Sequence, residues 1–196
     1  MKKLLIILFT LFISTAAFAE RPPMYAGAVM GFDGHCGPYI NHYFGSFAFE
    51  PHFGIYPFAK KNMGIEASFR FATKNDFNYG GYIGTGSYTE SYTAFIVRYL
   101  YEFKAIEEIP KLNIYGIAGL GMAFRKFDWL CYSNTRANET GNGWYTETEK
   151  RPCVTFPIGA GARYQIQDHI EAVAQAEFGL GYLLGFNLSV GVNYKF

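Results

Sequence analysis

The last eleven residues of the chain, FNLSVGVNYKF, alternate strictly between apolar and polar side chains. One face would carry Phe186, Leu188, Val190, Val192, Tyr194 and Phe196. The other would carry Asn187, Ser189, Gly191, Asn193 and Lys195. A period of two predicts a β-strand with one apolar and one polar face. Because a strand satisfies its backbone hydrogen bonds by pairing, this ending requires partner strands upstream.

Seven upstream segments show the same alternation, and each is long enough for a tilted membrane strand of roughly 9 to 11 residues. They run from Met24 to Asp33, Tyr43 to Tyr56, Met63 to Thr73, Tyr88 to Phe103, Leu112 to Arg125, Val154 to Ile166 and Ile170 to Tyr182. Gly27, Ala28 and Gly31 leave the facing of the first segment open. Pro51 predicts a bulge or irregularity in the second, since proline donates no ladder hydrogen bond.

The connections between these segments alternate in length. Residues 59–62, 104–110 and 167–169 are short connections, whereas 34–42, 74–87 and 126–152 are longer and polar or glycine-rich; the last, 183–185, is short again. Barrels of the outer membrane have short periplasmic turns and longer extracellular loops. The sequence therefore predicts an all-β fold, a transmembrane up-and-down antiparallel β-barrel of about eight strands.

The composition supports a membrane barrel over a soluble domain. The chain holds 22 Gly, 16 Tyr and 20 Phe, and 17% of its residues are charged, against about a quarter in soluble chains. Aromatic residues such as Tyr101 and Phe124 fall near the ends of the segments, as expected of aromatic girdles at the two interfaces. A soluble ligand-carrying barrel would need its apolar face inward. The balance of 17 basic and 16 acidic residues gives no support for nucleic-acid binding.

The N-terminus predicts a secretory signal peptide over residues 1–19. Lys2 and Lys3 precede an apolar run, and Ala17 and Ala19 form the small-residue cleavage motif, so the barrel domain would span 20–196. A membrane anchor is less favoured because the run is shorter than the roughly 20 residues of a spanning helix.

An eight-stranded barrel encloses a lumen that side chains fill. The inward set includes Glu50, Glu66, Arg70, Arg98, Glu102, Arg125, Arg163, Glu171 and Glu177. Both signs are present, and buried charge is tolerated when paired, so we expect a structural ion-pair plug with inward glycines making room for the long side chains. A narrow channel is the alternative, less favoured because open channels are typical of barrels with 16 or more strands.

Three cysteines, Cys36, Cys131 and Cys153, leave two states open in an exported chain. A disulfide between Cys131 and Cys153 would staple the polar segment between them and leave Cys36 free. Alternatively, all three are reduced, since sequence alone does not establish connectivity.

The signal peptide, the alternation, the loop asymmetry and the terminal Phe196 together resemble the small eight-stranded outer-membrane barrels of the OmpA/OmpX type and the related opacity and surface proteins. The resemblance covers the whole mature chain. It implies a monomer in the bacterial outer membrane, in contact with outer-membrane lipids. It also implies that the barrel-assembly machinery reads the closing strand through Phe196, Tyr194, Val192 and Val190. A structural role or surface contact through the outer loops would be its function.

Enzymatic chemistry finds little support. Some small outer-membrane barrels modify lipid A or phospholipids, but the His-x-Ser pair of the lipid A deacylases has no match, and His42 with Ser46 is the nearest couple. Asp33, His35, Cys36 and His42 fit no structural zinc spacing. We therefore expect no catalytic site, metal or cofactor.

The longest outer segment, 126–152, carries Trp129, Tyr132, Trp144 and Tyr145 among polar residues. Aromatic residues are favoured in recognition surfaces. This pattern suggests contact with an extracellular ligand that the sequence does not identify, or strands that simply extend beyond the membrane as an exposed sheet.

Overall fold

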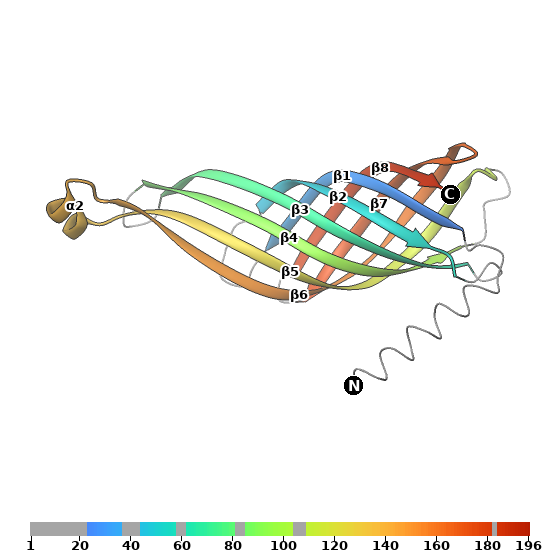
Figure 1. The fold of residues 1–196 in the computed structure, drawn as a ribbon, viewed down its shortest axis with the longest axis horizontal. Helices are drawn as coiled ribbons and strands as arrows, with labels where there is room; N and C mark the ends of the chain where they lie inside the picture. The colour runs from blue at the N-terminus through green and yellow to red at the C-terminus, as the bar shows by residue number, and fades with distance from the viewer. Residues whose placement is uncertain (1–22, 37–43, 58–61, 81–84, 104–108, 182–183) are drawn as a thin grey trace, which may run out of the picture.

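The computed structural model describes residues 23–36, 44–57, 62–80, 85–103, 109–181 and 184–196. Its strands are β1 (Met24–Cys36), β2 (Phe44–Ile55), β3 (Met63–Gly80), β4 (Thr85–Glu102), β5 (Leu112–Tyr132), β6 (Trp144–Gln167), β7 (Ile170–Gly181) and β8 (Leu184–Lys195). Each pairs antiparallel with its neighbours, and β1 pairs with β8 to close the barrel (Figure 1). The predicted fold is confirmed. Ala17 and Ala19 lie outside the described residues, so signal cleavage stays a prediction.

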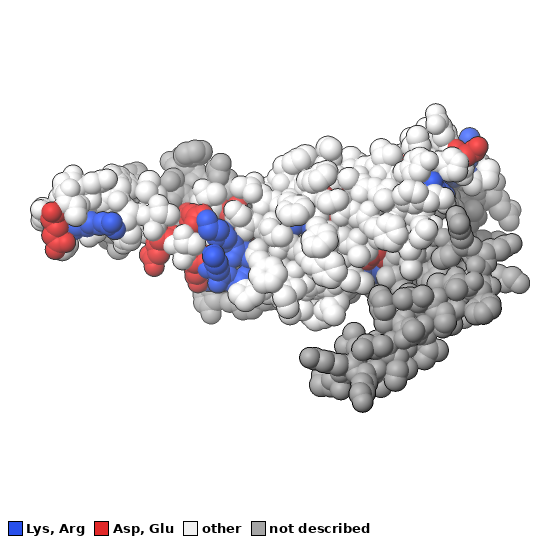
Figure 2. Space-filling view, viewed as in Figure 1, with Lys and Arg blue, Asp and Glu red and all other residues white. Residues whose placement is uncertain are grey.

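The two faces of each strand meet opposite environments. Outward side chains are apolar and exposed, such as Val190 at 60% and Phe69 at 50%, whereas inward Arg98 is 0% and Glu66 1% exposed. The barrel wall is consequently almost free of charge on its outer surface (Figure 2). This polarity is that of a barrel in lipid with a polar interior. It contradicts the soluble carrier, which needs the apolar face inside.

The structure settles the facing of β1, which its small residues left open in the sequence. Tyr25, Val29 and Asp33 are buried toward the lumen, while Met30 and Phe32 are exposed on the outside. At Pro51 the irregularity is a gap and not a bulge. The β2–β3 ladder pairs Phe49 with Phe71 and His52 with Ser68 in one register, and no β3 partner is assigned in between.

Inward glycines make room for more than the charged side chains we expected: Gly119 lies against the Arg98 side chain, but two others lie against aromatic rings. A Cβ at Gly54 would overlap the ring of Tyr25, and a Cβ at Gly161 would overlap the ring of Tyr115. The two small residues therefore allow large tyrosines to fill the inner part of the lumen.

Four strands continue well past the barrel. The β1–β2 ladder ends at His35–Phe44 and the β6–β7 ladder at Thr155–Gly181, but β5 and β6 stay paired up to Tyr132 and Trp144. Residues 74–80, 85–90, 126–132 and 144–152 thus form a four-stranded sheet, here called the outer extension, visible at the left of Figure 1.

The outer extension corrects the prediction that 74–87 and 126–152 are loops. Both segments are mostly strand, so the exposed-sheet interpretation was the right one for their backbone. The helix α2 (Asn134–Thr140) covers the tip. It begins after Ser133, whose side chain accepts from the Arg136 amide, and ends at Gly141, whose φ of 73° favours glycine. In the described part of the chain no helix is long and apolar enough to span a membrane.

Candidate functional site

Arg98 on β4 lies at the centre of the charged side chains in the lumen. Its guanidinium contacts Glu50 at 2.5 Å, Glu177 at 2.6 Å and Glu66 at 3.2 Å, and it donates to the Ser68 hydroxyl at 2.6 Å. The three carboxylates come from the neighbouring strands β2 and β3 and from β7, which lies across the barrel from β3. One side chain therefore connects strands that share no backbone hydrogen bonds with β4, apart from β3.

Arg70 on β3 shares two of these carboxylates. Its Nε lies 2.6 Å from Glu50 and its Nη2 lies 2.5 Å from Glu177, while Nη1 reaches Asp33 at 3.4 Å. Since all these groups are buried, the two arginines neutralise charges that bulk water does not reach. Burial without such partners would cost several kcal/mol per ion.

Arg163 on β6 forms a second layer nearer the inner end. Its guanidinium lies over the rings of Tyr25 and Tyr115, each with its centroid at 4.5 Å, and over Tyr56 at 5.4 Å. It donates to the Tyr25 hydroxyl at 2.8 Å and to Glu102 at 3.2 Å. The Tyr25 hydroxyl donates in turn to Glu66 at 2.7 Å, which joins this layer to Arg98.

We call the connected set the lumen network. Its members are Asp33, Glu50, Glu66, Arg70, Arg98, Glu102, Arg163 and Glu177 with Tyr25. Seven of the nine residues predicted for the plug belong to it, and two do not. Arg125 pairs with Glu90 toward the outer end, and Glu171 pairs with Lys195 at 2.5 Å near the inner end. Asp33, Glu90 and Tyr25 are partners that the sequence prediction missed.

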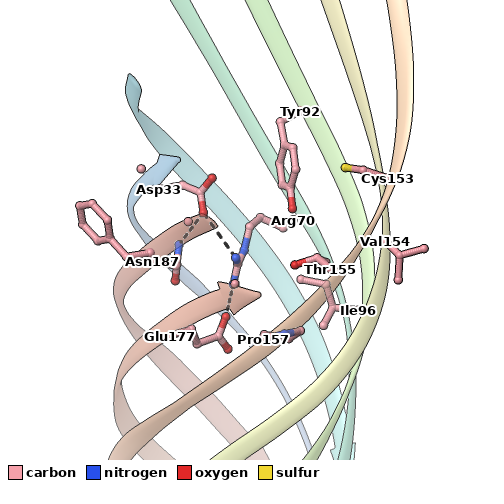
Figure 3. A pocket seen from close by; sticks show the side chains of 14 residues that line it. Asp33, Arg70, Tyr92, Ile96, Cys153, Val154, Thr155, Pro157, Glu177 and Asn187 are labelled. Atoms are coloured by element: carbon pink, nitrogen blue, oxygen red, sulfur yellow. Dashed lines mark hydrogen bonds and ion pairs between the residues drawn. The ribbon is translucent and has the colours of Figure 1, made fainter. Parts of the chain in front are cut away.

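A small cavity lies at the outer end of the lumen network (Figure 3). It measures about 40 Å³ and is bordered by Asp33, Arg70, Tyr92 and Asn187. A water molecule needs about 10–15 Å³ by this kind of measure, so the cavity has room for about three. Side chains fill the lumen around it, as expected for eight strands.

Of the two cysteine states that the sequence left open, the structure contradicts the Cys131–Cys153 disulfide. Neither Cys131 nor Cys153 is in a disulfide. Cys131 lies opposite Tyr145, whereas Cys153 lies opposite Ala123, eight residues further down β5. At about 3.3 Å per residue the two are about 26 Å apart along the strands, while a disulfide needs Cα atoms within about 7 Å.

The couple and the cluster weighed for chemistry lie in large part outside the described residues. His42 lies outside the described residues, as do the side chains of His35 and Cys36. Asp33 contacts Arg70 and Asn187, and the Ser46 hydroxyl lies 3.5 Å from the Asp33 carbonyl. Among described residues, no three His, Cys, Asp or Glu side chains are grouped to hold a metal.

The outer extension presents polar and aromatic side chains to water. Near its tip Tyr132 and Trp144 meet edge to face at 5.1 Å, and Arg136 of α2 lies 5.5 Å over the ring of Tyr145. The side chain of Trp129 lies outside the described residues.

Lower in the extension, Asp128 accepts hydrogen bonds from Lys126 Nζ and the Thr148 hydroxyl, both at 2.6 Å. The hydrogen bond from Lys126 lowers the pKa of Asp128 most, and the one from Thr148 lowers it further, so this pKa lies below its ordinary value.

The four residues predicted as an assembly signal all lie on the outward face of β8 or just after it. Val190, Val192, Tyr194 and Phe196 are 51–67% exposed, and the Phe196 amide donates to the Met24 carbonyl at 3.0 Å. They are thus available to lipid or to another protein. Recognition by the assembly machinery stays a prediction.

Known structures share this architecture at low sequence identity. A major outer membrane protein from Thermus thermophilus has a TM-score of 0.68 at 12% identity, covering 90% of this chain and 100% of that one. Neisserial surface protein A (NspA) has a TM-score of 0.61 at 12% identity, covering 88% of this chain and 97% of that one. Ail, the attachment invasion locus protein of Yersinia pestis, has a TM-score of 0.57 at 13% identity, covering 89% of this chain and 99% of that one. At these identities the likeness shows the fold.

A family model shows the family of the chain, which the structural likeness alone does not. No curated protein matches the sequence. The model of the outer membrane protein beta-barrel domain, however, matches residues 5–196. With a closed eight-stranded barrel, an apolar outer face and this match, the chain belongs to the outer membrane protein β-barrel domain family and is a protein of the bacterial outer membrane.

Proposed function

We propose that this barrel serves surface contact, with the outer extension as the contact element and no catalytic role for the lumen. The observation that carries the proposal is the outer extension itself. β5 and β6 run 21 and 24 residues, whereas β7 and β8 have 12 each. A membrane strand needs roughly 9 to 11 residues, so the excess length serves something outside the bilayer.

The tip of the extension has the composition of a recognition surface. Tyr132, Trp144 and Tyr145 gather beside α2, and Tyr132 and Trp144 are both 42% exposed. Aromatic side chains with few rotatable bonds give large contact area at a low entropic cost. Two similar barrels carry names that fit this role: a Neisserial surface protein and an attachment invasion locus protein, the latter also solved in complex with the heparin analogue sucrose octasulfate.

The test compares adhesion of cells that display the full chain or a trimmed one. In the trimmed variant, Asn-Gly replaces residues 127–149, so that Lys126 and Lys150, already opposite each other, flank a two-residue turn. We expect adhesion to epithelial monolayers and to immobilised heparin to fall to background, with the heat-dependent gel shift of the folded barrel retained. Full adhesion by the trimmed variant contradicts the proposal.

A second variant separates side chains from length. Replacing Tyr132, Trp144 and Tyr145 by serine keeps the strands and removes the aromatic surface, so we expect most of the adhesion to be lost. The matched control, Thr146→Ser with Glu147→Gln, changes exposed positions on the same strand and should bind like the wild type.

The lumen network supports a structural role alongside this contact function. Its ion pairs cross the barrel and fill the space that a channel would need. We expect no conductance steps in planar bilayers. Steps that disappear when the network charges are neutralised would favour the channel alternative. For the lipid-modifying alternative, the discriminating result is a changed lipid A mass profile in a deletion strain.

A further inference from the structure

The outward face of the β5–β6 hairpin changes from apolar to cationic within two rungs. Met122 lies opposite Val154, then Phe124 opposite Pro152, then Lys126 opposite Lys150. Met122, Phe124 and Val154 are 45–54% exposed on the lipid-facing side. The two lysines therefore stand one rung, or about 7 Å, beyond the last aromatic side chain. That is the depth at which an aromatic girdle gives way to lipid headgroups.

Two lysines directly opposite each other repel, and cross-strand pairs of like charge are destabilising. The hairpin offsets this only in part. Lys126 contacts Asp128 at 2.6 Å, whereas Lys150 is exposed, interacts with the same carboxylate only at longer range, and makes no hydrogen bond or direct ion pair among the described residues. The nearby Glu149 bonds to Arg151 on the other face of the sheet. This arrangement leaves the Lys150 ammonium group without a direct partner at the headgroup level, where Figure 2 shows blue side chains with red ones beside them at the base of the outer extension.

An apolar groove leads away from Lys150 toward the middle of the barrel. Its upper part is lined by Lys150, Pro152, Met122 and Val154. Met122 and Val154 also line its lower part, which continues over Val97 and Leu120. Ala118 lines this part too, and its small side chain leaves the groove open there. The groove is open to the outside, so a hydrocarbon chain could lie in it without entering the lumen.

We propose that this groove and the Lys126–Lys150 pair bind a phosphorylated glycolipid of the outer leaflet. A phosphate group would lie between the two ammonium groups, and one acyl chain would lie along Met122 and Val154. Charge complementarity argues for this occupant: an anionic headgroup removes the repulsion between the lysines, while the apolar floor below them requires a chain attached to that headgroup. A sulfated glycan or an acidic peptide satisfies the lysines but leaves the groove without a ligand.

The experiment measures lipid binding to the full chain refolded in detergent micelles, by native mass spectrometry. The probes are bisphosphorylated lipid A and the same lipid with both phosphates removed. We expect the phosphorylated form to bind more tightly. Lys150→Gln should weaken its binding about fivefold and Lys126→Gln with Lys150→Gln about 25-fold, as expected for basic residues near an anionic lipid surface. Ala118→Phe should also weaken binding, because the ring fills the groove.

The matched control is Lys111→Gln, which removes an exposed lysine at the opposite end of β5. It should bind lipid A like the wild type. The proposal is overturned if the dephosphorylated lipid binds equally well, if Lys111→Gln weakens binding as much as Lys150→Gln, or if Ala118→Phe has no effect. All these variants change exposed side chains, and the heat-dependent gel shift verifies that each is folded. The trimmed adhesion variant keeps both lysines, so loss of adhesion and loss of lipid binding are separable.

Discussion

The strands β5 and β6 pass through two environments while keeping one hydrogen-bonded ladder. Within the barrel, one face meets lipid and the other a filled lumen, so Arg163 is 2% exposed and held by Tyr25 and Glu102. In the outer extension, past the buried Phe127 and Glu90 at its base, water reaches both faces, and the Arg151–Glu149 pair is 40% and 45% exposed. The difference teaches that similar ion pairs on one pair of strands have unequal energetic value, because burial removes the screening by water.

The largest expected effect comes from removing the central cation of the lumen network. Arg98→Met leaves Glu50 and Glu177 with Arg70 alone and takes from Glu66 its closest guanidinium, all in a buried interior. It should destabilise the barrel by about 3–5 kcal/mol. Urea unfolding of the protein in lipid vesicles measures this. The matched change in the outer extension, Arg151→Met, should cost less than about 1 kcal/mol. Equal unfolding midpoints for the two variants would erase the distinction between the regions.

The next largest difference in stability between the two regions should come from a charge placed on the outward face. Val190 is 60% exposed and lies midway along β8, opposite Met30 and Ala174, so Val190→Arg should cost about 2–4 kcal/mol at the middle of the bilayer. Thr146→Arg, also outward but in the outer extension, should change stability by less than about 0.5 kcal/mol. The measurement is again the urea midpoint in vesicles. A tolerated arginine at position 190 would place β8 outside the hydrocarbon region.

A single hydroxyl group tests the link between the two layers of the lumen network. Tyr25→Phe removes the group that donates to Glu66 and accepts from Arg163, leaving both with one partner fewer, and should cost about 1–3 kcal/mol. Tyr145→Phe in the outer extension removes a hydroxyl with no described hydrogen bond and should be neutral. If Tyr25→Phe is neutral as well, the layers are independent, and Arg98 and Arg163 variants should then be additive.

The same contrast explains what the sequence could and could not predict. The alternation predicted the strands and the inward orientation of Glu66 and Arg98, because lipid on one face and a polar lumen on the other impose a period of two. In 126–152 water on both faces removes that constraint, so the segment reads as a loop although it is mostly strand. That error also made the Cys131–Cys153 bridge plausible, since the ends of a flexible loop can meet while two rungs of a ladder cannot.

Partner choice in the lumen was beyond the sequence for a different reason. Alternation along a strand tells whether a side chain faces the lumen. Its depth in the lumen depends on the stagger between neighbouring strands, which is fixed only when all eight strands are paired. Arg125 was therefore grouped with the plug although it lies level with Glu90. Asp33 was missed because Gly27, Ala28 and Gly31 carry too little hydrophobic signal to orient β1.

The smallest expected effect is a pH dependence confined to the outer extension. Hydrogen bonds from Lys126 and Thr148 hold the pKa of Asp128 below its ordinary value, so the charged carboxylate favours the folded hairpin. This contribution is fully present above the pKa that the carboxyl has in the unfolded chain and is lost as the pH falls through its lower folded value. Amide hydrogen exchange of residues 126–130 and 146–150 should accelerate in Asp128→Asn at neutral pH, and variant and wild type should converge in acid. Exchange within β7 and β8 should not change, because the lumen side chains there do not contact Asp128. A difference that persists in acid would mean that Asp128 acts through the shape of its contacts with Thr148 and not through its charge.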